Sequence, residues 1–149
     1  MSQKKYPSNI IVYTNNSKST RPIKFFDDHN VEVIERRVSR SLEPLTEKEV
    51  IKILNVSGGF QDILADRSRV YKEKIEPLLN AGEITVKELI QFIIKNPSVL
   101  RYPIIIDEKR CEIGYNDDNI RAFLPRVVKN QLFRQALDNA YDECFNNAI

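Results

Sequence analysis

The chain of 149 residues has few of the side chains on which metal and redox sites depend. It contains one histidine, His29, and two cysteines, Cys111 and Cys144. A zinc site normally takes four nitrogen or sulfur ligands, so this set is too small without help from carboxylates. The cysteines lie in dissimilar, distant segments, and a structural disulfide is not expected in a reducing compartment. The sequence therefore predicts no metal, no cofactor and no disulfide, and His29 is expected to cap a helix end.

Long apolar runs are also absent. No stretch reaches the roughly 18 apolar residues that a membrane-spanning helix needs, and no apolar core of signal-peptide length follows residues 1–5. Hydrophobic residues make up 42% and charged residues 30%, with a net charge of +2. This balance is typical of globular proteins and too weakly basic to indicate nucleic-acid binding by itself. We expect a cytoplasmic, monomeric protein without a membrane partner.

The first forty residues predict a β-α-β unit. Residues 9–14 are β-branched and aromatic, as in a strand, and Pro22 suits the first turn of a helix that continues to about Asp28. Residues 31–37 alternate apolar and charged side chains, which indicates a second, half-buried strand. Such a unit favours parallel pairing of its two strands.

An all-helical block is predicted next. Two capping boxes, at residues 46–49 and 85–88, start helices that carry apolar residues to about position 55 and to position 94. A short helical piece near residues 62–64 and a helix over 68–79 lie between them. The block, residues 45–97, is therefore expected to be a helical lobe inserted into a β/α core formed by residues 9–44 and 98–130.

The chain then returns to a sheet and ends in a helix. Residues 103–106 are a compact apolar run, and residues 111–115 are expected to form the second strand of a hairpin. A short helix should follow to Phe123. Beyond Pro125 apolar residues come in pairs, which predicts an amphipathic C-terminal helix within residues 126–149. The simplest architecture is α/β, a mixed β-sheet with helices packed on it.

A dense motif in the second half of the chain resembles that of a known protein family. Residues 102–110 (YPIIIDEKR), then 114–116 (GYN) and 123–126 (FLPR), resemble the Spx family of transcriptional regulators, which is related to the arsenate reductases. The resemblance extends upstream through residues 66–69, Gly59 and residues 13–14, covers roughly residues 9–130, and is weak in the N-terminal loop. The resemblance implies a thioredoxin-like fold with a helical insertion, of arsenate-reductase/Spx type. It also favours a cis bond before Pro103, although general statistics favour trans.

The resemblance also implies a partner, the C-terminal domain of the RNA polymerase α subunit, with promoter DNA bound only together with polymerase. Spx proteins keep a glycine at the position of Gly59 where this domain docks, and Asn55, Val56, Ser57 and Gly58 would flank the contact. We expect Gly59→Arg to abolish binding and leave the fold intact. On composition alone, the Gly58-Gly59 pair is a helix stop.

Spx proteins carry a C-x-x-C motif after the first strand, and the resemblance puts Lys18 and Arg21 in its place. A reductase needs a thiolate there, because the thiolate attacks arsenic. Arg67 matches one arginine of the family's anion pocket, while Tyr102 stands where another is expected. We therefore expect no enzyme and no cysteine redox switch, only a vestigial redox or anion site at Lys18, Arg21, Arg67 and Tyr102. Cys111 is expected to be a buried, inert side chain.

Four basic residues are candidates to face DNA: Arg69, Arg101, Arg126 and Lys129. In the C-terminal helix the bases come first and the acids last, which opposes the helix dipole. Either the basic start faces an acidic surface or phosphate, or the order reflects local pairing such as that of Arg134 with Asp138. Two rival functions remain. One is an anion-binding protein of the same fold, and the other is a competitor for the α subunit that does not activate transcription.

Overall fold

The computed structural model describes residues 5–15, 21–65 and 69–146. Its centre is a four-stranded sheet of order β2-β1-β3-β4. The strands are β1 (Ile11–Thr14), β2 (Ile34–Arg37), β3 (Ile104–Ile106) and β4 (Cys111–Ile113). β1 pairs parallel to β2 and antiparallel to β3, and β4 completes the β3 hairpin. The predicted mixed sheet and β-α-β start are confirmed, with α1 (Arg21–Asp28) as the connecting helix.

The second strand is shorter than predicted. The register with β1 covers only β2, and the fully buried valines of the segment, Val31 and Val38, lie just outside it. Within β2 only Arg36 is half-buried. At this edge of the sheet the flanking segments, rather than the strand, therefore supply the buried side chains.

Alternate residues of the central strands face two different cores. Val12 of β1 and Ile105 of β3 belong to a cluster with Phe25 and Phe26 of α1. Tyr13 of β1 joins the larger cluster on the other face. This two-sided burial follows from the period of two along a strand and explains why every residue of β3 is buried.

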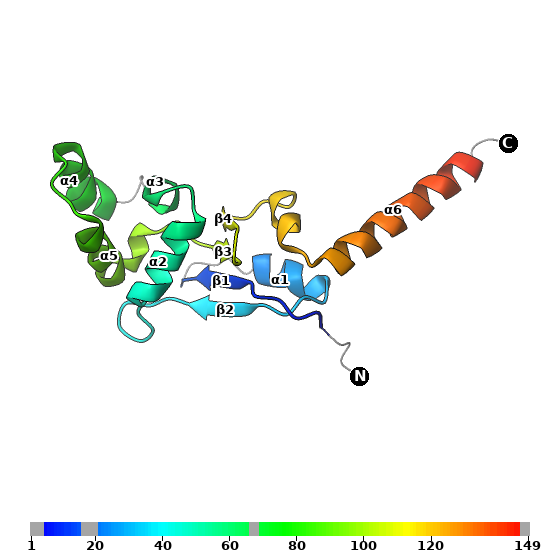
Figure 1. Ribbon diagram of the computed structural model, residues 1–149, viewed down its shortest axis with the longest axis horizontal. Helices are drawn as coiled ribbons and strands as arrows, with labels where there is room; N and C mark the ends of the chain where they lie inside the picture. Colours follow the sequence, from blue (N-terminus) through cyan, green and yellow to red (C-terminus); the bar gives the residue numbers. More distant parts are fainter. Residues whose placement is uncertain (1–4, 16–20, 66–68, 147–149) are drawn as a thin grey trace.

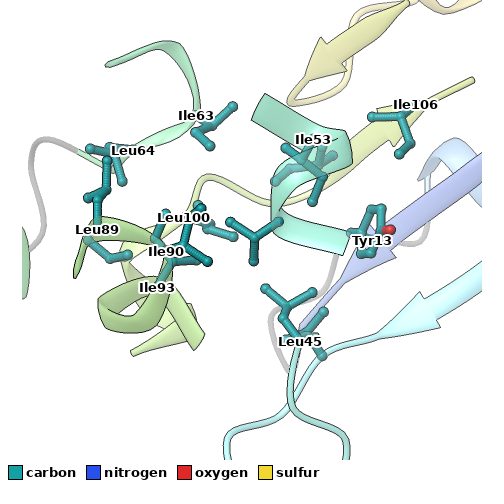
Figure 2. Packing of buried hydrophobic residues seen from close by; sticks show 14 of the residues in the cluster. Tyr13, Leu45, Ile53, Ile63, Leu64, Leu89, Ile90, Ile93, Leu100 and Ile106 are labelled. Carbon is teal, nitrogen blue, oxygen red and sulfur yellow. The ribbon is translucent and has the colours of Figure 1, made fainter. Parts of the chain in front are cut away.

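The larger cluster extends from the sheet into the helical lobe (Figure 2). It receives side chains from α2 (Glu47–Val56), α3 (Phe60–Ile63), α5 (Val86–Lys95) and the 3₁₀ turn η2 (Pro97–Val99). Figure 2 shows Tyr13 of the sheet beside Ile53 of α2, with Ile90 and Ile93 of α5 farther along the same cluster. One continuous core therefore fixes α2 against the sheet.

Both predicted helix starts are present. The Thr46 hydroxyl accepts from the Glu49 N–H, and the Glu49 carboxylate accepts from the Thr46 N–H. At α5 the Thr85 hydroxyl accepts from the Glu88 N–H and donates to the Glu88 carboxylate. Such caps each contribute about 1 kcal/mol. The helix end at His29 is also as expected, since both its backbone N–H and its ring Nδ1 lie within hydrogen-bond distance of the Phe25 carbonyl.

The helix expected over residues 68–79 differs from a regular α-helix in its described part. A π-helical turn, η1 (Tyr71–Ile75), leads into α4 (Glu76–Ala81). Pro77 gives the reason, because it has no N–H to donate and its ring disfavours a regular turn before it. The wider turn is closed by the Glu76 N–H, which donates to the Tyr71 carbonyl.

The last elements are the 3₁₀ turn η3 (Asn119–Phe123) and α6 (Arg126–Asn146). Val128 of α6 is buried against the α1 side of the sheet and Leu132 is half-buried there. Beyond that point α6 projects away from the body of the molecule, on the side opposite the helical lobe (Figure 1). The predicted C-terminal helix is confirmed, but most of its apolar side chains are exposed rather than packed.

Candidate functional site

The segment of residues 55–59 lies on the surface where α2 ends. Asn55 and Gly58 are exposed, and Val56, Ser57 and Gly59 are half-buried. The Ser57 N–H donates to the Ile53 carbonyl at 2.9 Å, and its hydroxyl donates to the Leu54 carbonyl at 3.1 Å. α2 therefore ends before the two glycines, with Ser57 in an extended conformation as its C-cap.

Gly59 has a backbone conformation that other residues rarely adopt. Its φ is 146° and its ψ 166°, a region used almost only by glycine. A Cβ built on Gly59 meets nothing within 4 Å, so the position has open space in front of it. Its carbonyl accepts from the Asp62 N–H at 3.2 Å and so leads the chain into α3. The expectation that Gly59→Arg would leave the fold untouched therefore needs a control, because any side chain strains this backbone.

An exposed face of α2 adjoins the segment, and the sequence reading did not include it. Lys48, Ile51, Lys52 and Asn55 are all exposed and follow the i, i+3, i+4, i+7 spacing of one helix face. Ile51 is 44% exposed and is the apolar residue of this face. The sequence could have predicted this exposed face, because Val50 and Ile53 mark the other, buried face of the helix.

An ion pair missed at the sequence level holds the start of α2 against the sheet. Arg36 Nε of β2 lies 3.0 Å from Glu49 Oε2, and the same guanidinium donates to the Pro44 carbonyl at 2.8 Å. Tyr13 lies nearby. Burial, and after it the Glu49 carboxylate, raises the pKa of Tyr13 to about 12, so its hydroxyl stays neutral. The sequence spacing of Arg36 and Glu49 does not predict their contact.

The vestigial loop site is only partly described. Lys18 and Arg67 lie outside the described residues. Arg21 begins α1, and its guanidinium carbon lies 5.9 Å from the centre of the Tyr115 ring. The Tyr102 hydroxyl donates to the Pro97 carbonyl at 2.8 Å, and burial raises its pKa. The Tyr102–Pro103 bond is cis, as the resemblance favoured.

One polar atom near this loop stands out. Thr14, the last residue of β1, is 3% exposed, and its hydroxyl finds no hydrogen-bond partner among the described residues. Buried hydroxyls usually have a partner.

Cys111 is half-buried and packs against the larger core. Burial, and then the carboxylates of Glu112 and Asp62, raises the pKa of its thiol to about 11, so it is protonated at neutral pH. Cys111 pairs with Ile106, which pairs with Ile11 at the start of β1. It is thus two strands, about 10 Å, away from β1 and at the end opposite Thr14. It cannot replace a thiol in the loop after β1.

The four candidate DNA-facing residues do not form one patch. Arg69 makes an ion pair with Glu73 at 2.7 Å, at the helix that leads into α4. Arg101 is exposed just before β3, and its N–H donates to the Ile63 carbonyl. Arg126 and Lys129 lie at the start of α6, across the sheet from α4 (Figure 1). They line the same groove of about 720 Å³, where the Lys129 ammonium donates to the Ala122 carbonyl at 2.9 Å.

The part of the chain that the structure describes contains neither a membrane-spanning helix nor a cluster of metal ligands. No helix there is both long and apolar enough to cross a bilayer. Nor do three or more His, Cys, Asp or Glu side chains gather there in a way that could hold a metal ion.

Comparisons with known proteins add sequence relatives to this geometry. The model of the ArsC family matches residues 13–123. A Global transcriptional regulator Spx from Streptococcus mutans is 46% identical over 112 residues, which cover 74% of this chain and 73% of that protein. Global transcriptional regulator Spx 1 from Oceanobacillus iheyensis is 40% identical over 113 residues, covering 75% and 82%.

Solved structures agree on the fold. An ArsC-family-related protein from Bacteroides fragilis superposes with a TM-score of 0.61 at 19% identity, over 78% of this chain and 98% of that chain. An arsenate reductase from Vibrio cholerae gives 0.61 at 13% identity, over 80% and 100%. At such identity the likeness bears on the fold alone. It confirms the predicted α/β architecture of arsenate-reductase type.

Proposed function

This chain belongs to the ArsC family, and because relatives that align with three quarters of it are Spx global transcriptional regulators, we propose that it regulates transcription. The observation that carries this proposal is the 46% identity with one of these regulators. It exceeds by far the identity with the arsenate reductase of known structure. The proposed function therefore rests on the sequence relatives, while the solved structures bear on the fold alone.

In finer detail, the proposal is that the chain binds the C-terminal domain of the RNA polymerase α subunit. The contact would involve residues 55–59 together with the exposed face of α2. Three properties support this surface. It presents an exposed isoleucine, Ile51, between two lysines. It has open space in front of Gly59. Finally, the core and the Arg36–Glu49 pair hold α2 rigidly, which lowers the entropy cost of binding.

The chain would act on promoters without a cysteine switch and without catalysis. Cys111 is the only cysteine within the span matched by the family model, and the raised pKa of its thiol argues against reactivity at neutral pH. Promoter DNA would be contacted only in the polymerase complex. Arg126 and Lys129 are the neighbouring pair best suited to a phosphate, while Arg69, paired with Glu73, is the poorest candidate.

Calorimetric titration of the purified α C-terminal domain into this chain tests the proposal. We expect binding in the micromolar range, and transcription from a dependent promoter that changes with added protein. No binding up to tens of micromolar would remove the α-binding proposal. Binding without any change in transcription would identify the competitor function instead.

The anion-binding function is a second candidate, favoured by the buried hydroxyl of Thr14, which has no hydrogen-bond partner among the residues that the structure describes. Titration with phosphate or sulfate tests it. Binding that is lost in Thr14→Val, a change that keeps the shape and removes the hydroxyl, would support an anion site beside β1. Equal heats for the two proteins would end this candidate.

A further inference from the structure

The exposed part of α6 carries an apolar seam. Phe133, Leu137, Ala140 and Cys144 are all exposed and follow each other at intervals of four, three and four residues. That is the 3.5-residue repeat with which one helix packs along another. The Tyr141 and Phe145 rings, their centres 4.2 Å apart, stack beside the seam and are each about 60% exposed. Isolated apolar residues on a surface are common, but a continuous row indicates an interface.

A hollow adjoins the seam. A hollow of about 520 Å³ is lined only by side chains of α6, among them Val127, Phe133, Arg134 and Leu137. A hollow between the side chains of one helix is what a side chain of a second helix would fill. Beyond Leu132, α6 projects away from the body of the molecule, so its outer part is open to a second helix (Figure 1).

The two halves of α6 carry opposite charges. Residues 126–137 contain three basic side chains and no acidic one, while residues 138–146 contain three acidic side chains and no basic one. The basic residues are Arg126, Lys129 and Arg134, and the acidic ones are Asp138, Asp142 and Glu143. This order opposes the helix dipole, so it costs stability in an isolated helix. A partner helix with its charges in the reverse order would place opposite charges side by side, which stabilises the pair.

We propose that α6 is a self-association surface, which pairs antiparallel with α6 of a second copy of this chain. The helix is its own complement only in that arrangement. About a two-fold axis near Gln135, the basic half of each copy lies along the acidic half of the other. Parallel pairing would set three bases beside three bases and three acids beside three acids.

About the same axis the two seams overlap at their inner ends, where Phe133 of one copy meets Leu137 of the other. Farther out, Ala140 lies level with Asn130 and Cys144 with Arg126 of the second copy. Arg134 comes within two residues along the axis, about 3 Å, of the partner's Asp138, and Lys129 is as close to the partner's Glu143. The two helix dipoles also run in opposite directions, which is favourable. The prediction of a monomer from the sequence did not consider this exposed row.

One helix per chain makes a small interface, so the dimer should be weak, with a dissociation constant of about 10–100 μM. Sedimentation equilibrium of the full chain from about 1 to 300 μM therefore tests the proposal. We expect a reversible monomer–dimer equilibrium that weakens as salt is raised, because exposed charge pairs are screened. A chain that is monomeric at the highest concentration would overturn the proposal.

Charge reversal tests the complementarity. The variant R126E/K129E/R134E and the variant D138K/D142K/E143K should each be monomeric. Their equimolar mixture, and the variant with all six changes, should dimerise again. The reversals place acids in the first turn and bases near the end, which the helix dipole favours, so loss of association cannot come from a weaker helix. Circular dichroism checks this. Dimers of wild-type strength in both triple variants would overturn the proposal.

Cysteine crosslinking tests the direction. Antiparallel pairing holds the two copies of Cys144 about 27 Å apart, so mild oxidation should yield little crosslinked wild-type protein. In Arg126→Cys the new thiol meets Cys144 of the second copy, and a crosslinked dimer should form at least about tenfold faster. Cys144→Ser in that background should abolish it. Rapid crosslinking of the wild type through Cys144 would mean parallel pairing and would overturn the antiparallel proposal.

Discussion

Arg36 Nε of β2 and Glu49 Oε2 of α2 lie 3.0 Å apart, and this pair joins the edge of the sheet to the first turn of the helix that carries the proposed polymerase surface. Glu49 also closes the capping box with Thr46. One carboxylate thus fixes both where α2 begins and where it lies on the sheet. The proposed surface, which runs along α2 to residues 55–59, depends on that placement.

Glu49→Gln should lower stability at neutral pH by about 1 kcal/mol, because glutamine can still complete the capping box but cannot form the ion pair. Urea unfolding at pH 7 measures the change. Arg36→Met should cost a similar or larger amount. The double variant should cost less than the sum of the two, since the partners act as a unit.

The same pair predicts a dependence on acid. Burial alone would raise the pKa of Glu49, but hydrogen bonds from Arg36 and Thr46 outweigh it and hold the pKa below its ordinary value of 4.5. A group whose folded pKa is lowered contributes stability above its unfolded pKa and loses it as pH falls through the folded pKa. Wild-type stability should therefore fall more steeply than that of Glu49→Gln below about pH 4.5. Parallel curves would contradict this.

The two cysteines should react at very different rates. Cys144 is exposed on α6, while Cys111 is half-buried with a pKa raised to about 11. At pH 7.5, iodoacetamide should alkylate Cys144 at least about tenfold faster, because the thiolate is the nucleophile. Mass spectrometry of the digested protein measures both rates. Equal rates would mean that Cys111 is more accessible than its packing indicates, and would reopen the question of a cysteine switch.

The exposed face of α2 should matter for polymerase binding. Ile51→Glu should weaken binding of the α C-terminal domain by about tenfold or more, because it places a charge in the contact. Val86→Glu is the matched control, since Val86 is an exposed apolar residue at the start of α5. Titration of both variants measures the difference. A loss of the same size in the control would indicate a general effect on the lobe.

Local rules predicted much of this fold. Thr46 and Thr85 marked the helix starts, and the apolar run at residues 104–106 marked the buried strand of the hairpin. Pro77 could have predicted the irregular turn before α4 but was not used. The Arg36–Glu49 pair could not be predicted, because it depends on how β2 and α2 pack. The exposure of α6 could not be predicted either, since an apolar pattern does not say which surface covers it.

The central claim is that the surface around Gly59 binds the polymerase α subunit, and a pair of glycine variants tests it most directly. Gly59 and Gly82 both have positive φ and open space for a side chain. Gly59→Arg and Gly82→Arg therefore add the same bulk and charge at two different surfaces, although the strain is larger at Gly59, whose backbone conformation is used almost only by glycine, than at Gly82, which is in the left-handed helical region. Gly59→Ala shows the effect of strain without bulk at the proposed site.

The α C-terminal domain is titrated into each variant, after thermal unfolding has shown that all are folded. The account predicts that Gly59→Arg loses at least about tenfold in affinity, or 1.4 kcal/mol, and that Gly82→Arg binds like the wild type. Gly59→Ala should remain close to the wild type. Unchanged binding by a folded Gly59→Arg, or an equal loss in Gly82→Arg, would contradict the account.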